Sequence, residues 1–298
     1  MLTIGTFDGV HIGHQKIVQQ LNAAADKING ESVLFTFYPH PRMVLFPDSH
    51  GLKLIQTQRE KLDKLKRFGL KNVIVYPFTH EFSRLTATEF VRNYLVNKLK
   101  VKKMIIGYDH QFGKNREGTL ELLKDLAPIY DFQVQEIPAQ DIESVNVSST
   151  KIRKSLQNGD VSTATQYLGE FFELSGTVIH GNKIGRTINF PTANIAVDSE
   201  IKVIPANGVY AVRVVLENRT EYFGMLNIGK KPTVNNENYI SLEVNILDFV
   251  GDLYNQAITV KFLSKLRDEQ KFEGLTDLQT QIKKDEQVVR NAIHTSNW

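Results

Sequence analysis

Two histidines three residues apart, His11 and His14, end a glycine-rich string at residues 5–14 that reads Gly-Thr-Phe-Asp-Gly-Val-His-Ile-Gly-His. The string follows a short apolar segment that suits a buried strand and runs into a segment with helical spacing. At such a strand-to-helix turn, free backbone N–H groups and the helix dipole favour a phosphate. Its glycines, which leave room for a ligand beside the backbone, are Gly5, Gly9 and Gly13. Two imidazoles there can donate hydrogen bonds to a phosphoryl group as its charge shifts.

A bare His-x-x-His pair is more often two surface histidines, and a zinc-binding pair is a further alternative. The chain has no cysteine and no third ligand at helical spacing, which weakens the zinc alternative. The full string resembles the His-x-Gly-His motif of the nucleotidyltransferase superfamily. That resemblance implies phosphate contacts by both histidines and nucleotide binding by Gly5, Phe7, Asp8 and Gly9.

A second set of polar residues lies at 147–153, Val-Ser-Ser-Thr-Lys-Ile-Arg, before a predicted helix over 151–156. Any single hydroxyl there is most simply a helix cap. Three hydroxyls and two cations at one helix start can also cradle a triphosphate. The string resembles the Ser-Ser-Thr-x-Ile-Arg motif of the same superfamily, which implies ATP contacts by Ser148, Ser149, Thr150 and Arg153.

A third set lies at 181–194, from Gly181 to the tetrapeptide Pro-Thr-Ala-Asn. The Thr192 hydroxyl and the Asn194 amide oxygen are hard ligands that suit Mg²⁺, although short strings of this kind are usually turns. The string resembles the motif of riboflavin kinases, and this resemblance implies ATP binding by Gly181, Lys183, Gly185, Thr192 and Asn194. Glu243, which on a strand is most often a solvent-facing residue, stands where that family has its catalytic base.

Taken together, the motifs resemble bacterial bifunctional riboflavin kinase/FAD synthetase in order and over nearly the whole chain. Two further loops match the family and imply flavin contacts in the adenylyltransferase, at Pro39, His40, Pro41, Asp109 and Phe112. A Leu-Arg-Asp-Glu segment implies a flavin contact by Arg267 in the kinase. The chain departs from the family pattern at His110, where Phe is usual, and at Asn189, where Gly is common.

These residues must be positioned by two kinds of fold. Strand candidates at 2–5, 32–37, 72–77, 103–106 and 133–137 alternate with helical patterns at 15–28, 57–68, 87–98 and 118–131. Such alternation predicts a parallel, Rossmann-like sheet with helices on both faces. Strand-like runs at 174–180, 209–216, 222–228, 241–247 and 257–263 predict an antiparallel β-barrel. A terminal helix over 275–292 follows, with Thr276 and Gln279 spaced as a capping box. We predict domains at 1–170 and 171–298.

Composition bounds the class of protein. The 298 residues suffice for roughly two domains, and 41% hydrophobic with 23% charged residues is ordinary for a globular protein. The absence of cysteine excludes disulfides and thiol catalysis. The net charge of +3 fits anionic small molecules better than a nucleic-acid track. We expect a cytoplasmic protein without signal peptide or membrane span, a monomer or weak homo-oligomer that binds no nucleic acid.

The resemblance implies two reactions: phosphorylation of riboflavin to FMN by ATP in the C-terminal domain, and adenylylation of FMN to FAD in the N-terminal domain. Mg²⁺ would accompany ATP in both. Two alternatives remain at this point: a nucleotidyltransferase for another phosphorylated metabolite with a regulatory second domain, and a flavin-binding module without turnover. Intact His11, His14 and Glu243, with the Pro-Thr-Ala-Asn string, favour the bifunctional enzyme.

Overall fold

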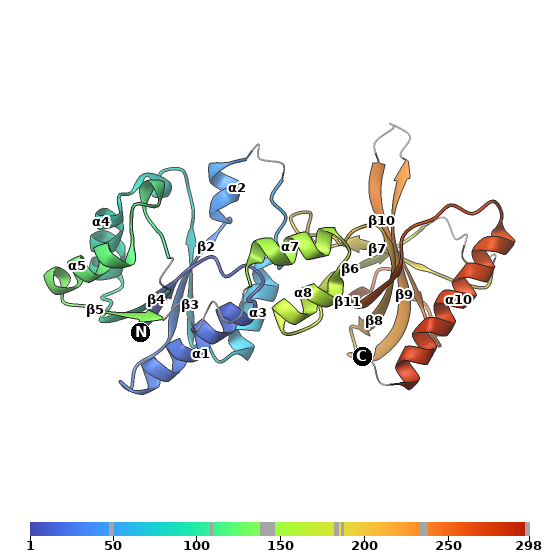
Figure 1. Cartoon of the computed structure of the whole chain (residues 1–298), viewed down its shortest axis with the longest axis horizontal. Helices are drawn as coiled ribbons and strands as arrows, with labels where there is room; N and C mark the ends of the chain where they lie inside the picture. The colour runs from blue at the N-terminus through green and yellow to red at the C-terminus, as the bar shows by residue number, and fades with distance from the viewer. Residues whose placement is uncertain are drawn as a thin grey trace. The chain divides into compact units, whose positions relative to one another are not determined.

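The computed structural model describes residues 1–47, 51–107, 110–137, 147–181, 185, 188–232 and 238–295. The chain forms two compact units, Met1–Ser149 and Thr150–Trp298, and Figure 1 shows the helices and strands of each. In the described part of the chain, no helix is long and apolar enough to cross a membrane.

The first unit is built on a five-stranded parallel sheet in the order β3-β2-β1-β4-β5. Its strands are β1 (Leu2–Ile4), β2 (Val33–Tyr38), β3 (Asn72–Pro77), β4 (Lys103–Gly107) and β5 (Gln133–Ile137). The predicted strands are confirmed to within about a residue at each end. The central strands are buried on both faces, as parallel sheets require, so they form nearly continuous apolar runs.

Helices cover both faces of this sheet (Figure 1). On one face, Leu34 and Ile105 pack with buried residues of α1 (Ile12–Asp26) and α3 (Gln58–Arg67). On the other face, Phe35 packs with side chains of α4 (Ala87–Phe90), the π-helical segment η2 (Val91–Lys98) and α5 (Leu120–Tyr130). Neighbouring residues of a strand point to opposite faces, so Leu34 and Phe35 serve different cores.

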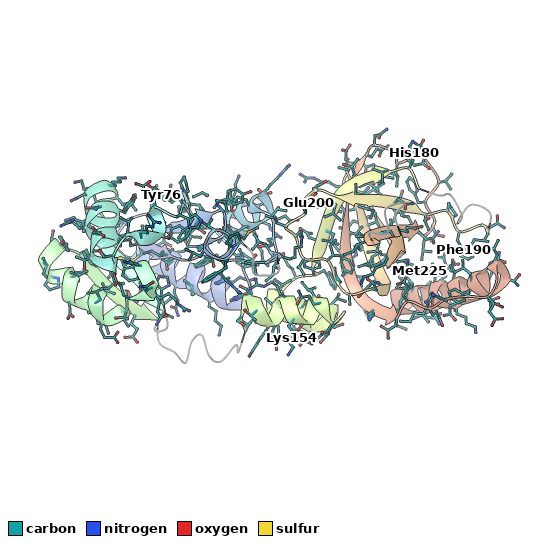
Figure 2. All side chains as sticks on the ribbon, turned by 90° about the horizontal axis from the view of Figure 1, so that it is seen from above. Tyr76, Lys154, His180, Phe190, Glu200 and Met225 are labelled. Carbon is teal, nitrogen blue, oxygen red and sulfur yellow. The ribbon has the colours of Figure 1, made fainter. Side chains whose placement is uncertain are left out.

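Part of the second face is an aromatic cluster around Tyr76, which Figure 2 labels. The Tyr76 ring stacks on Phe35 at 5.6 Å between centroids and meets Phe82 at 4.9 Å. Its hydroxyl lies 3.3 Å from that of Tyr94 on η2. Aromatic pairs at these separations add to the area that they bury, so the cluster stabilises the sheet against η2.

Two local details of the first unit differ from expectation. The stretch after β2 that was matched to a family loop at Pro39, His40 and Pro41 contains a short helix, α2 (Pro41–Leu45), with Pro41 in its first turn and His40 as its N-cap. The helix predicted over 87–98 starts as α4 and continues as the π-helical η2. Short 3₁₀ turns lie at η1 (Phe82–Arg84) and η3 (Lys114–Arg116). The helix α2 can form at Pro41 because proline is compatible with the first turn of a helix.

The second unit is a closed antiparallel barrel in the order β10-β7-β6-β11-β8-β9. Its strands are β6 (Glu173–Ile179), β7 (Ala193–Val197), β8 (Gly208–Leu216), β9 (Glu221–Pro232), β10 (Asn238–Ile246) and β11 (Ala257–Arg267). The fold class predicted from sequence, a parallel sheet followed by an antiparallel barrel with a terminal helix, is confirmed. The strand β7, which carries Asn194, was not predicted because the Pro-Thr-Ala-Asn string resembles a turn.

Helices α7 (Ser149–Gln157), α8 (Val161–Leu168) and α10 (Leu275–His294) complete the described helices of this part of the chain. The capping box predicted for α10 is wrong. The helix already begins at Leu275, its N-cap is Gly274, and the Gln279 side chain donates to the carbonyl of Ile188 instead. Capping boxes are present at Thr57 with Glu60 and at Thr86 with Glu89.

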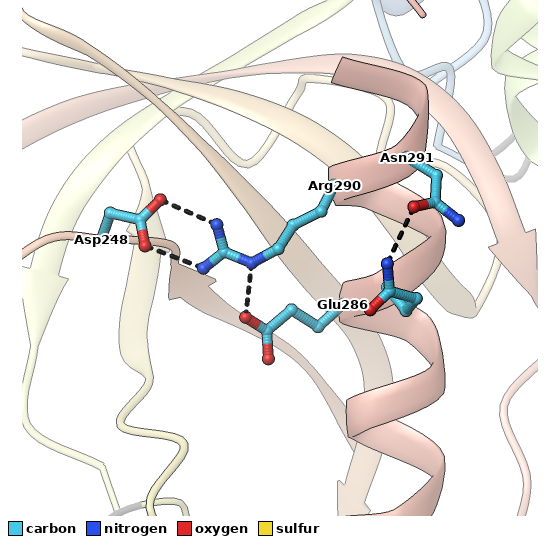
Figure 3. Close-up of polar contacts among 5 residues, drawn as sticks. Asp248, Glu286, Arg290 and Asn291 are labelled. Carbon is cyan, nitrogen blue, oxygen red and sulfur yellow. Dashed lines mark hydrogen bonds and ion pairs between the residues drawn. The ribbon is translucent and has the colours of Figure 1, made fainter. Parts of the chain in front are cut away.

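Helix α10 lies against the barrel (Figure 1), with Val289 packed against Val209 and Met225. Arg290 ties the same helix to the end of β10, as Figure 3 shows. Its guanidinium donates to both oxygens of Asp248 at 3.0 and 2.8 Å, and to Glu286 at 2.8 Å. A bidentate arginine–carboxylate pair is geometrically the most favourable ion pair, although this one is largely exposed.

Replacing Arg290 with methionine is expected to lower the free energy of unfolding by about 0.5–1 kcal/mol, a value reduced for solvent screening. Arg290 holds the pKa of Asp248 below its usual value, chiefly by hydrogen bonding. The contribution is therefore present at neutral pH and is lost as the pH falls through the pKa of the folded state. Urea unfolding of both proteins at pH 7 and pH 3 measures this. A stability difference that does not shrink at pH 3 contradicts the ion-pair explanation.

Candidate active sites

The loop after β1 has a strained backbone. Phe7 has a φ of 52° and Val10 a φ of 38°, the latter unusual for a β-branched residue. The Val10 N–H donates to the Phe7 carbonyl at 3.2 Å, and both side chains are buried. Residues outside the common backbone regions persist only where the surrounding structure holds them, and they concentrate at functional sites.

The surroundings of this loop explain how it is held. The Asp8 carboxylate accepts hydrogen bonds from the backbone N–H groups of Ile55, at 3.0 Å, and Gln56, at 3.4 Å. Gly9 has a φ of 84°, and a Cβ at this position would lie 2.9 Å from the Ile55 side chain. Glycine is therefore required both by conformation and by space. Asp8, expected to bind nucleotide, supports the loop in this structure.

The two histidines lie together at the start of α1. The rings of His11 and His14 stack at 3.6 Å between centroids, and the opposite face of His14 stacks on Phe7 at 4.4 Å. His11 is the N-cap of α1, and its Nδ1 accepts a hydrogen bond of 3.3 Å from the His14 N–H. A spacing of three positions puts both imidazoles on one face of a helix, and the structure brings them into direct contact.

This geometry determines the charge and the tautomer of His11. Burial, reinforced by the positive charge of Lys64, lowers the pKa of His11 to about 4, so the ring is neutral at pH 7. Because Nδ1 accepts a hydrogen bond, the single proton of the neutral ring is assigned to Nε2. Burial likewise lowers the pKa of His14 well below its usual value. Its Nδ1 is buried and has no hydrogen-bond partner among the described residues.

The second predicted motif reaches the first one. The Ser149 hydroxyl donates to the Asp8 carbonyl at 2.9 Å, across 141 positions of sequence. A Cβ on Gly13 would lie 3.3 Å from the Val147 side chain. Residues 147–149 therefore adjoin the loop and helix start at residues 5–14, here called the histidine loop. Thr150 and Arg153 follow on α7, in the unit that begins at Thr150.

The predicted flavin contacts of the first unit have different surroundings. His40 caps α2, its Nδ1 accepting from the Arg42 N–H at 3.2 Å, with Pro39 and Pro41 on either side. Phe112 is only 8% exposed and packs within the hydrophobic core. The His110 ring stacks on Phe112 at 6.1 Å, so an aromatic contact exists despite the departure from the family pattern. Asp109 lies outside the described residues.

In the second unit, the third motif and Glu243 meet on adjacent strands. Glu243 of β10 pairs with Asn194 of β7, and on its other side with Asn227 of β9. The Thr192 hydroxyl donates to Glu243 Oε2 at 3.3 Å. Glu243 is half-buried, unlike the solvent-facing alternative. Three oxygen-bearing side chains thus converge although 51 positions separate Thr192 from Glu243.

At two glycines of the motif, other groups of the chain approach the backbone too closely for a side chain to fit. A Cβ on Gly181 would overlap the Asn194 amide, and one on Gly185 would overlap the Phe190 carbonyl oxygen. Asn189 has a φ of 60°, a left-handed conformation that asparagine tolerates better than most residues. This explains why asparagine can replace the glycine common in the family. Lys183 lies outside the described residues.

Two further polar residues of the second unit make defined contacts of their own. Asn245, two positions after Glu243, is buried and donates to the Pro191 carbonyl at 2.8 Å, so it holds the residue before Thr192. Arg267, predicted to contact flavin, forms an ion pair of 2.9 Å with the buried Asp285 of α10.

Comparison with known proteins identifies a family for each part of the chain. Residues 1–151 match the family described as FAD synthetase, and residues 168–293 match the family described as riboflavin kinase. A solved chain titled macrolide-efflux protein from Streptococcus pneumoniae superposes with a TM-score of 0.88 at 36% identity, covering 97% of this chain and 93% of the other.

Relatives named bifunctional riboflavin kinase/FMN adenylyltransferase are similar over nearly their whole length. The protein from Haemophilus influenzae is 38% identical, with 97% of this chain and 92% of the relative covered. Those from Listeria monocytogenes and Escherichia coli strain K12 are also 38% identical, with 97% and 91% covered. The chain therefore belongs to the bifunctional riboflavin kinase/FMN adenylyltransferases, with an N-terminal FAD synthetase region and a C-terminal riboflavin kinase region.

Proposed function

We propose that the two reactions of this family, riboflavin to FMN and FMN to FAD, are carried out by the two sets of residues described above. FMN adenylylation is assigned to the histidine loop with residues 148–153. Riboflavin phosphorylation is assigned to Glu243 with Thr192 and Asn194. The observation that carries the kinase assignment is the hydrogen bond between the Thr192 hydroxyl and the half-buried Glu243 carboxylate beside Asn194.

In adenylyl transfer, the FMN phosphate attacks the α-phosphorus of ATP and pyrophosphate leaves. A phosphate monoester is already an anionic nucleophile, so catalysis is positioning and charge stabilisation rather than base catalysis. The neutral His11 donates from Nε2 to the reacting phosphates, and His14 contacts them beside it. The roles of Gly5, Phe7 and Gly9 are to shape the loop around ATP. Ser148, Ser149, Thr150 and Arg153 hold the β and γ phosphates.

In riboflavin phosphorylation, the nucleophile is a primary alcohol. A carboxylate that accepts its proton helps the attack on the γ-phosphorus, and Glu243 is assigned that role. Gly181, Lys183 and Gly185 approach the phosphates of ATP. The hydroxyl of Thr192 and the amide oxygen of Asn194 form a hard donor set that fits Mg²⁺. When bound there, Mg²⁺ neutralises phosphate charge.

Flavin binding is assigned to Pro39, His40, Pro41, Asp109 and Phe112 in the adenylyltransferase and to Arg267 in the kinase. Phe112 can contact flavin only with the part of its ring that core packing leaves accessible. Arg267 can contact flavin only with guanidinium atoms that the ion pair with Asp285 does not occupy. We further propose a cytoplasmic protein, a monomer or weak homo-oligomer, whose partners are ATP, riboflavin and FMN rather than nucleic acid.

Incubation with riboflavin, ATP and Mg²⁺, followed by chromatography of the flavins, tests the pair of activities. FMN is expected to appear first and FAD to follow. FAD formed only from supplied FMN indicates a nucleotidyltransferase with a regulatory second domain. Bound flavin without conversion indicates a binding module.

The domains are expected to work separately, within the proposed limits of 1–170 and 171–298. A fragment of residues 172–298 should convert riboflavin to FMN. A fragment of residues 150–298 should do the same and unfold at a higher temperature, because it retains α7 and α8. The Ala206 N–H donates to the Leu156 carbonyl at 3.0 Å, and both helices bury apolar side chains. Calorimetry and a kinase assay on both fragments measure this. A folded 172–298 fragment without kinase activity contradicts independent domains.

A further inference from the structure

Two lysines of α3 are buried beneath the histidine loop. Lys61 is 7% exposed and Lys64 is 1% exposed, and they lie three positions apart on the helix face that also carries the buried Leu65. Lysine is almost never fully buried without a compensating partner. Neither ammonium group belongs to the residues assigned to the two reactions.

Lys61 is held at the carboxyl edge of the sheet. Its Nζ donates to the Thr6 carbonyl at 3.2 Å, just after β1, and to the Thr36 hydroxyl at 3.2 Å, near the end of β2. The neighbouring Lys64 Nζ donates to the Gly9 carbonyl at 3.3 Å. Helix α3 therefore presents two cations to the loop that carries His11 and His14. Ligands of open parallel sheets bind at this edge.

The charge of Lys61 is not matched by a close carboxylate. Among the described residues, no carboxylate oxygen lies within 4 Å of the Lys61 Nζ, and both of its hydrogen-bond acceptors are neutral oxygens. Burial lowers the pKa of Lys61 to about 8, and the more distant Asp8 opposes this only in part. A methionine would fill such a position without the cost of burying a charge. An anionic ligand above the loop would supply the missing negative charge.

We propose that Lys61 is a positioning residue of FMN adenylylation, which links Thr6 of the histidine loop to Thr36 of β2 and supplies fixed positive charge toward the phosphates bound at that loop. The inference rests on the proposed assignment of adenylylation to residues 5–14. Lys64 supports the Gly9 backbone of the same loop. The other charged and titratable groups facing this cluster are Asp8 on the loop and His11 and His14 on α1.

The test compares Lys61→Met, Lys61→Arg and the matched control Lys66→Met, which makes the same change at an exposed position of α3. Both activities are measured on each preparation, so riboflavin phosphorylation reports whether the protein is folded. Lys61→Met is expected to lower kcat/KM for FMN adenylylation about tenfold or more, with phosphorylation unchanged. Lys66→Met is expected to change neither.

The pH profile distinguishes charge from packing. In wild type, kcat/KM for adenylylation is expected to fall above about pH 8, as the Lys61 ammonium of the free enzyme loses its proton. Lys61→Arg stays charged and should lack this fall, and Lys61→Met should be low and flat. If Lys61→Met does not fold, the Lys61→Arg profile decides: an alkaline fall that persists in it overturns the inference.

Binding gives a readout without turnover. At pH 8, Mg-pyrophosphate binding followed by calorimetry in two buffers of different ionisation enthalpy is expected to show proton uptake in wild type and less uptake in Lys61→Met. Wild-type adenylylation and proton uptake in Lys61→Met overturn the inference. If His14→Ala also leaves adenylylation intact, the assignment of the site itself fails. If His14→Ala loses adenylylation while Lys61→Met keeps it, the site stands and only the role of Lys61 is overturned.

Discussion

Glu243→Gln is expected to lower the rate of FMN formation by about 10²- to 10⁴-fold, while FAD formation from supplied FMN continues. Glutamine keeps the shape of the side chain and can still meet the Thr192 hydroxyl, but it cannot accept a proton. The half-buried carboxylate lies between Asn194 and Asn227 on neighbouring strands, so the change removes basicity with little change of packing. Initial rates at saturating ATP and Mg²⁺, with each flavin as substrate, measure this.

Glu221→Gln is the matched control for this prediction. Glu221 is a carboxylate of β9 in the same barrel, paired with Arg213 and Lys261 near the surface. Its replacement should change stability by about 1 kcal/mol or less and leave the kinase rate unchanged. Asn194→Ala is expected instead to raise KM for Mg-ATP. Riboflavin turnover by Glu243→Gln within a few-fold of wild type would show that this carboxylate is an ordinary strand residue.

His14→Ala is expected to lower FAD formation by about 10²-fold or more and to leave FMN formation unchanged. The ring lies between Phe7 and His11, so its removal deletes a donor and also opens the stack. His14→Phe separates these effects, because it preserves the stack and removes both ring nitrogens. It should be as impaired as His14→Ala if the nitrogens act on phosphate.

His80→Ala, at an exposed loop position of the same unit, controls for loss of a histidine. Rates of FMN adenylylation, with riboflavin phosphorylation assayed in parallel, provide the comparison. Near-normal adenylylation by His14→Phe reduces the role of His14 to packing. Near-normal adenylylation by His14→Ala refutes the site.

The sequence predicted the elements that depend on local pattern. The central strands β1, β2 and β4 lie where short, mainly apolar runs alternate with helical spacing, because a strand buried on both faces must be largely apolar. The strand-to-helix turn at residues 5–14 was predicted for a similar reason, since glycines and a helix start follow each other directly in the chain. Asn194 and Glu243 were singled out by their motifs, but their pairing across β7 and β10 required the barrel register.

Tertiary structure alone decided which polar groups became buried. The sequence of α3 shows lysines at 61, 64 and 66 with nothing to distinguish them, yet only Lys61 and Lys64 face the loop after β1. The stack of Phe7 on the histidines, the Asp8 bonds to residues 55 and 56, and the Arg267 pair with Asp285 depend likewise on segments distant in sequence. Local propensity is set by neighbours along the chain, whereas burial, and with it the pKa of His11 and Lys61, is set by what packs against them.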